Sequence, residues 1–111
     1  MVAPKTELFD ETLVEQANLF KALAHPARLA ILKYLAETKT CISGDISDEL
    51  PLSRTTVNQH LKELKDAGLI QGHVEGVKTN YCLNVKVVEK ATKLLNEFLA
   101  ELKLPENFKC Q

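Results

Sequence analysis

Tryptophan is absent from this 111-residue chain, and aromatic residues make up only 5% of it. Apolar residues nevertheless reach 45%, so we expect a folded chain whose core consists of leucine, valine, isoleucine and alanine. No run of about 18 apolar residues and no N-terminal apolar stretch of about 7–15 residues occurs, which argues against a membrane span and a secretory signal. We therefore expect a single cytoplasmic domain over residues 1–111.

The sequence also lacks the usual marks of an enzyme. It contains no glycine-rich phosphate loop and no nucleophile–base motif, and it is short for a large catalytic cleft. An excess of positive charge is missing too, since the net charge is −1 and the pI is about 6.3. This balance is the main compositional argument against nucleic-acid binding, for which a basic domain is typical. Residues 53–81 are locally basic, however, with four cations against three anions.

Hydrophobic periodicity predicts a mainly α-helical chain with a small β-hairpin, made of five helices and a two- to three-stranded antiparallel sheet. Glycine, proline and capping residues mark where these elements end. The outer helices are expected at 10–23 and 85–103, and the first has an apolar stripe wide enough for two partners. The second helix should turn Leu29, Ile31, Leu32 and Leu35 inward. The other expected elements are a helix at 26–37, a strand at 40–42 ending before the N-cap Ser43, helices at 44–50 and from the N-cap Ser53 to Gly68, and a hairpin at 69–84 with Gly76 at its tip.

Residues 53–68 combine an apolar stripe with a polar face. Val57, Leu61 and Leu64 recur at helical spacing, so their side of the helix should pack on the domain. The other side carries hydroxyl, amide and cationic groups, which can contact bases and phosphates in a DNA major groove. A helix, a tight turn, a second helix and a hairpin over residues 46–84 together predict a winged helix-turn-helix.

Within this polar face we expect Thr55, Asn58 and Gln59 to contact base edges, and Arg54 and Lys62 to contact phosphates. A solvated polar face without a ligand is the alternative. The hairpin residues His73 and Lys78 are candidates for DNA contact or for ordinary exposed polarity. The full set predicted to bind DNA is Ser53, Arg54, Thr55, Thr56, Asn58, Gln59, Lys62, His73 and Lys78.

Two further histidines are assigned structural roles. His60 lies beside the apolar stripe and is predicted to be a helix-packing or hydrogen-bonding residue rather than a ligand. His25 precedes Pro26 and is predicted to be a cap or junction residue.

Several motifs, in this order, resemble the ArsR/SmtB-type family of bacterial repressors. Phe20–Leu29 is similar to the family's entry into its second helix, and Ser53–Leu64 to its recognition helix. Asp66–Ile70, followed by Gly76 and Tyr81–Leu83, is similar to its wing. The resemblance covers roughly residues 8–102. It implies a homodimer paired through its first and last helices, which binds a pseudo-palindromic DNA operator and is released by an inducer.

The metal sites of the family are where the sequence departs from it. Many members carry a Cys-x-Cys pair at the start of the third helix, and here Ile42-Ser43-Gly44 stands instead. Other members bind zinc through aspartate and histidine on the last helix, and residues 84–103 contain neither. A zinc sensor of either kind is therefore not expected, and no cofactor is assigned with certainty.

Three cysteines remain, Cys41, Cys82 and Cys110, and in the cytoplasm we expect them as reduced thiols. Together they are candidate ligands for a soft ion such as arsenite. A dithiol pair among them would instead suit a redox-sensing repressor. The plainer alternative is that they are buried small apolar residues.

We therefore predict a dimeric transcriptional repressor whose partners are double-stranded operator DNA and a second copy of the chain, with no membrane. The alternative from another class is a winged-helix module that binds proteins and does not read DNA, which the acidic balance favours.

Overall fold

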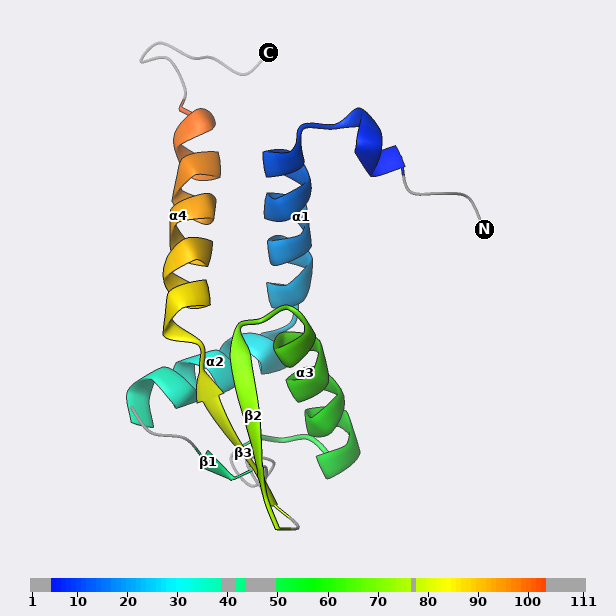
Figure 1. Cartoon of the computed structure of the whole chain (residues 1–111), viewed down its shortest axis with the longest axis vertical. Coiled ribbons are helices and arrows are strands. Elements are labelled where there is room, and N and C mark those ends of the chain that lie inside the picture. Colours follow the sequence, from blue (N-terminus) through cyan, green and yellow to red (C-terminus); the bar gives the residue numbers. More distant parts are fainter. Residues whose placement is uncertain (1–4, 39–41, 44–49, 77, 104–111) are drawn as a thin grey trace.

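The computed structural model describes residues 5–38, 42–43, 50–76 and 78–103 (Figure 1). A short 3-10 helix precedes four α-helices and three β-strands in this part of the chain. The predicted mainly helical chain with an antiparallel sheet is therefore confirmed. The elements are α1 Glu11–Leu23, α2 Pro26–Thr38, β1 Ile42–Ser43, α3 Arg54–Asp66, β2 Ile70–Glu75, β3 Lys78–Leu83 and α4 Val85–Glu101.

Two of the predicted elements need comment. The sequence predicts five helices, and the described ranges contain four α-helices. The helix expected at 44–50 falls on residues 44–49, which lie outside the described ranges. Ser43 belongs to β1, where it pairs with Asn80 of β3, and the helix that it is predicted to cap lies outside the described residues. Thr40 and Cys41, expected in the same strand, lie outside the described residues.

The two ends of α3 follow from its sequence. The hydroxyl of Ser53 accepts a hydrogen bond from the backbone N–H of Thr56 at 3.2 Å, which satisfies one of the free donors of the first turn. At the other end Gly68 has a φ of +81°, a left-handed conformation that glycine adopts without strain and that commonly follows a helix. The chain then enters β2 at Ile70.

The sheet is antiparallel, with β3 between β1 and β2. β2 and β3 form the predicted hairpin, in which Ile70 pairs with Leu83 and Glu75 with Lys78. Gly76 lies in the connecting turn with a φ of +63°, as expected for a hairpin tip. In Figure 1 this tip extends away from the helices at one end of the molecule.

The core lies where α2, α3 and the sheet meet. Ile31 of α2 and Leu64 of α3 are completely inaccessible to solvent, and Leu61 is 1% exposed. The prediction that Leu29 points inward is wrong, because it is 48% exposed. The buried positions of α2 recur at i, i+4 and i+8, and Leu29 lies half a turn away from them. The core cluster contains Ile31, Leu35, Val57, Leu61, Leu64, Leu69, Ile70 and Ala91.

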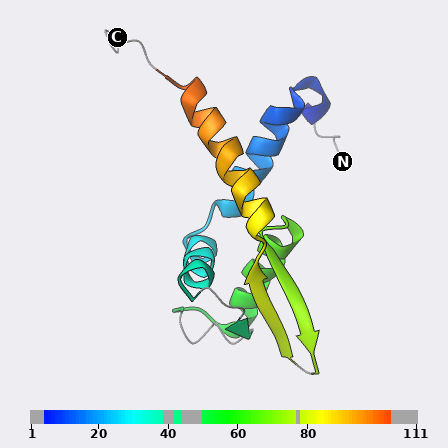
Figure 2. The ribbon, with the colours of Figure 1, turned by 60° about the vertical axis from the view of Figure 1, so that its left-hand side comes forward.

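α1 and α4 lie side by side and rise from this core in Figure 1, and Figure 2 shows them diverging at their far ends. Phe20 of α1 and Phe98 of α4 meet edge to face, with ring centroids 5.5 Å apart. Each of the two helices buries only one residue, Gln16 in α1 and Ala91 in α4.

Candidate nucleic-acid interface

The predicted division of α3 into two faces is confirmed. Val57, Leu61 and Leu64 are at most 1% exposed, and they fix the helix against the core. Thr55, Asn58, Gln59 and Lys62 are all exposed on the other side. α3 therefore presents a continuous polar face to solvent, and this face consists of the side chains that can donate to and accept from base edges.

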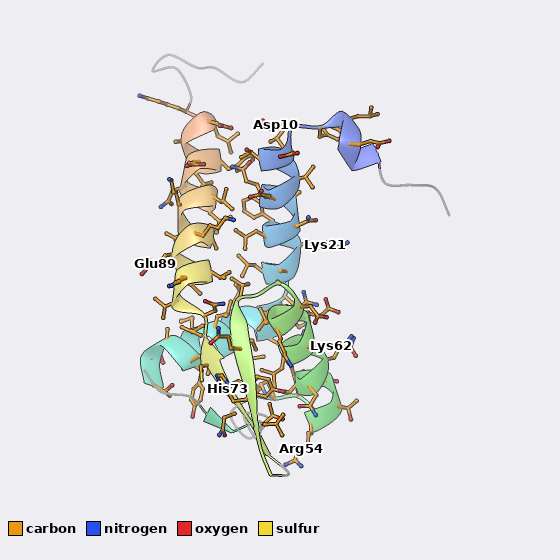
Figure 3. All side chains as sticks on the ribbon, viewed as in Figure 1. Asp10, Lys21, Arg54, Lys62, His73 and Glu89 are labelled. Carbon is orange, nitrogen blue, oxygen red and sulfur yellow. The ribbon has the colours of Figure 1, made fainter. Side chains whose placement is uncertain are left out.

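The first turn of α3 has a structural role of its own. Besides capping the helix, the Ser53 hydroxyl donates to the hydroxyl of Thr56 at 3.0 Å. Both side chains are exposed but already hydrogen-bonded to each other. Arg54 begins the helix and is exposed at its N-terminal end, the end nearest the hairpin tip (Figure 3).

Lys62 extends outward from the middle of α3 (Figure 3), and its ammonium lies 3.9 Å from the carboxylate of Asp66, one turn further on. The two side chains are 73% and 62% exposed, so solvent screens this ion pair strongly. The pair therefore holds Lys62 only weakly, and the side chain can turn toward a phosphate.

The two hairpin residues predicted to contact DNA, His73 and Lys78, do not both lie beside the polar face of α3. A Cβ at Gly72 of β2 would lie 3.6 Å from the side chain of Lys65, so Gly72 faces α3. His73 is the next residue, so its exposed side chain points to the opposite side of the hairpin (Figure 3). The fold therefore does not bring His73 onto the polar face of α3. Lys78 begins β3 opposite Glu75, and its side chain lies outside the described part of the structure.

His60 and His25 have the structural roles predicted for them. His60 is 7% exposed, and its Nδ1 accepts a hydrogen bond from Nε of Arg28 at 3.2 Å. His25 caps α2, because its Nδ1 accepts from the backbone N–H of Ala27 at 3.0 Å. The rings of the two histidines are 4.2 Å apart. Sequence reasoning missed Arg28 as a bonding partner, since nothing local connects α2 with α3.

The expectation of reduced thiols is wrong for Cys82, which is disulfide-bonded. Cys82 is the only cysteine within the described residues, and Cys41 and Cys110 lie outside them. A disulfide sulfur is not a thiolate, so in this state Cys82 cannot serve in the predicted three-cysteine site. No group of three or more potential metal ligands occurs among the residues that the structure describes.

An apolar groove runs along α1, with Phe98 of α4 at one side. It has a volume of about 420 Å³ and includes Phe9, Leu13 and Phe20, which are 61%, 42% and 40% exposed. Gln16 lies beneath it at 2% exposure and donates from Nε2 to the carbonyl of Leu94 at 3.1 Å. The Oε1 of Gln16 has no hydrogen-bond partner within the described ranges.

A three-stranded sheet ending in a hairpin, packed beside a helix with an exposed polar face, defines a winged helix-turn-helix protein. A family model described as "Helix-turn-helix domain" matches residues 23–73. The chain is 37% identical over 87 residues to the HTH-type transcriptional regulator MJ1325 of Methanocaldococcus jannaschii. The aligned region covers 78% of this chain and 98% of that protein.

Two further comparisons identify the family. The chain is 38% identical over 73 residues to the HTH-type transcriptional repressor SmtB of Mycobacterium tuberculosis, covering 66% of this chain and 53% of the repressor. An ArsR-like transcriptional regulator from Rhodococcus sp. RHA1 superposes with a TM-score of 0.68 at 28% identity, covering 84% and 87% of the two chains. The chain belongs to the ArsR/SmtB family of winged helix-turn-helix proteins, which bind DNA and regulate transcription.

One finding bears on the membrane. Among the described residues, no helix combines the length and the apolar character needed to cross a bilayer.

Proposed function

We propose that this chain is a homodimeric repressor that binds a specific DNA operator through the exposed face of α3 and is released by an inducer. The polar face of α3 carries the proposal, because an apolar stripe behind it fixes which side chains point outward. Thr55, Asn58 and Gln59 contact base edges, and Asn and Gln suit adenine in particular. Ser53 and Thr56 hold the first turn of the helix at the phosphate backbone.

The cationic side chains position the protein on the duplex. Arg54 approaches phosphates from the first turn of α3, and Lys62 does so from the middle of the helix. His73 and Lys78 approach the backbone from the hairpin, His73 from the side away from α3. The chain has a net charge of −1, so these few phosphate contacts provide only modest affinity for DNA of any sequence. Contacts to base edges provide the additional affinity for the operator.

The expected result is tight, salt-sensitive binding to the DNA upstream of the chain's own gene. The affinity should fall with a log–log slope of about −0.9 for each phosphate contacted, because neutralised phosphates release counterions. Fluorescence anisotropy over a salt series measures this, with unrelated DNA of equal length as the control. Equal binding to both DNAs, or none, would favour a module that binds proteins instead.

Dimerisation places two copies of α3 on one operator. The apolar groove along α1 supports a second copy as its occupant, since Phe9, Leu13 and Phe20 are exposed together on a helix that buries only Gln16. In this proposal the first and last helices form the dimer contact and residues 1–111 form one domain.

A charge placed in the groove should separate the protomers. Leu13→Glu is expected to sediment as a monomer at concentrations where the parent is a dimer, because a carboxylate would be buried without a partner. Its operator affinity should fall as well, since each monomer holds only one half-site. Analytical ultracentrifugation gives the answer, and Ala36→Glu on the exposed side of α2 is the matched control. A dimeric Leu13→Glu protein would remove the groove from the interface.

Control by cysteine chemistry is a second candidate, favoured by the disulfide at Cys82. β3 carries Cys82 opposite Gln71 of β2, so a change at this sulfur acts directly on the hairpin. If oxidation is the signal, adding reductant changes operator affinity and Cys82→Ser abolishes that change. If Cys41, Cys82 and Cys110 bind arsenite once reduced, arsenite releases DNA only from the reduced protein. Unchanged affinity in all of these arms would leave the cysteines a structural role.

A further inference from the structure

A polar cluster joins three elements at the base of α1. Arg28 lies in the first turn of α2 and is half-buried. Its Nε donates to Nδ1 of His60 on α3 at 3.2 Å, and its Nη1 donates to the carbonyls of Ala22 and Lys21 at 3.2 and 3.4 Å. These carbonyls belong to the last turn of α1, where a cation is favoured. One guanidinium thus ties α3 to the C-terminal end of α1.

The two imidazoles of this cluster are both used as acceptors. His25 accepts from the backbone N–H of Ala27, and His60 accepts from Arg28, each through Nδ1. Their ring centroids lie 4.2 Å apart. A proton on Nδ1 of His60 turns this acceptor into a donor that faces the N–H of Arg28, so the hydrogen bond between α2 and α3 does not survive protonation of His60. A charged ring at His60 would also repel the guanidinium of Arg28.

We propose that Arg28, His25 and His60 form a proton-controlled latch that holds α3 in its DNA-binding position, so that acidification below neutral pH weakens operator binding. The proposal rests on the proposed function and adds a means of regulating it. Arg28 and His60 act as positioning residues, since His60 is buried and neither belongs to the exposed polar face of α3.

The charges around His60 favour its neutral form. Burial lowers the pKa of His60, and the neighbouring His25 and Arg28 lower it further, while Glu63 on the same helix acts in the opposite direction. His60 therefore binds a proton more readily when the latch is open. Protons then shift the population toward the open state as the pH falls below about 6.5, the ordinary histidine value.

The same shift makes stability depend on pH. The pKa of His60 is lower in the folded chain than in the unfolded chain, so the unfolded chain binds more protons below about pH 6.5. The stability associated with neutral His60 is thus complete above that pH and is lost as the pH falls toward the folded pKa.

The test measures operator affinity by fluorescence anisotropy between about pH 7.5 and 6.0. All of these measurements use a His73→Gln background, so that His25 and His60 are the only histidines in the chain. We expect affinity in this background to fall by up to about fourfold over the range, the limit for one histidine that binds its proton near its ordinary pKa only when the latch is open. Adding His60→Gln should flatten the profile, since an amide oxygen accepts from Arg28 without titrating. Arg28→Met should bind more weakly at the upper pH and also show a flat profile.

A profile that stays as steep with His60→Gln as without it would overturn the proposal. A second measurement needs neither DNA nor a substitution. In a nuclear magnetic resonance titration, the backbone amides of α3 should shift with the same midpoint as the His60 ring. If the α3 amides shift with the His60 midpoint but the protein binds no operator at any pH, the latch is supported and the DNA-binding proposal is rejected. If the α3 amides do not follow His60, the latch itself is rejected.

Discussion

Replacing Asn58 and Gln59 together by alanine should weaken operator binding by at least about 30-fold, because each well-placed amide contact to a base contributes about 1–3 kcal/mol. Both side chains are exposed on α3, beside the buried stripe that orients them. Thermal stability should hardly change, since exposed positions of this kind tolerate alanine. Affinity for unrelated DNA should also be kept, because the phosphate contacts remain. Anisotropy titrations on operator and unrelated DNA measure both quantities.

Two control variants show whether the loss comes from base contacts. Asn96→Ala removes an exposed amide from α4, far along the chain from α3, and should leave both affinities unchanged. Lys62→Ala should weaken binding to both DNAs alike and reduce the magnitude of the salt slope by about one, as expected for a phosphate contact. If the double variant behaves like Lys62→Ala, the amides of α3 do not read sequence.

Leu61→Ala should cost about 2–5 kcal/mol in the free energy of unfolding, the usual range for truncating a fully buried leucine. Leu61 is 1% exposed and belongs to the core cluster formed by α2, α3 and the sheet. A loss of this size is a large part of the stability of a small domain, about 5–15 kcal/mol. Urea unfolding followed by circular dichroism measures the change.

Leu29→Ala is the matched control, because it removes the same atoms from a leucine that is 48% exposed on α2. We expect a change of no more than about 0.5 kcal/mol at this position. Both variants should be compared at one protein concentration, since the unfolding midpoint of a dimer depends on concentration. Similar losses in the two variants would mean that the core is not organised around α3 as described.

Local signals in the sequence predicted α3 and the hairpin well. Ser53 satisfies free backbone donors, the spacing of Val57 and Leu61 sets the buried side, and Gly76 takes the positive φ of the hairpin tip. Each of these features is decided within a few neighbouring residues, which is why composition and periodicity reveal it. The exposed polar face of α3, and with it the candidate site, could therefore be predicted.

The remaining features depend on contacts between distant segments. The link from Arg28 to His60 spans 32 positions, and that from Gln16 to Leu94 spans 78, so no local pattern encodes either. The side of the hairpin on which His73 lies depends on how β2 packs against α3. The apolar character of Leu29 suggests an inward side chain. The core contacts only one side of α2, however, and Ile31 lies on that side.

The uneven burial of the helices has a consequence for dynamics. α2 and α3 bury three and four residues, whereas α1 and α4 bury one each. We therefore expect the backbone amides of α3 to open to solvent only when the whole domain unfolds, and the far ends of α1 and α4 to open locally at much lower cost in free energy. In the isolated chain, amide hydrogen exchange should therefore be faster at the far ends of α1 and α4 than in α3, and a partner that covers the groove along α1 should slow exchange in these two helices without changing that of α3.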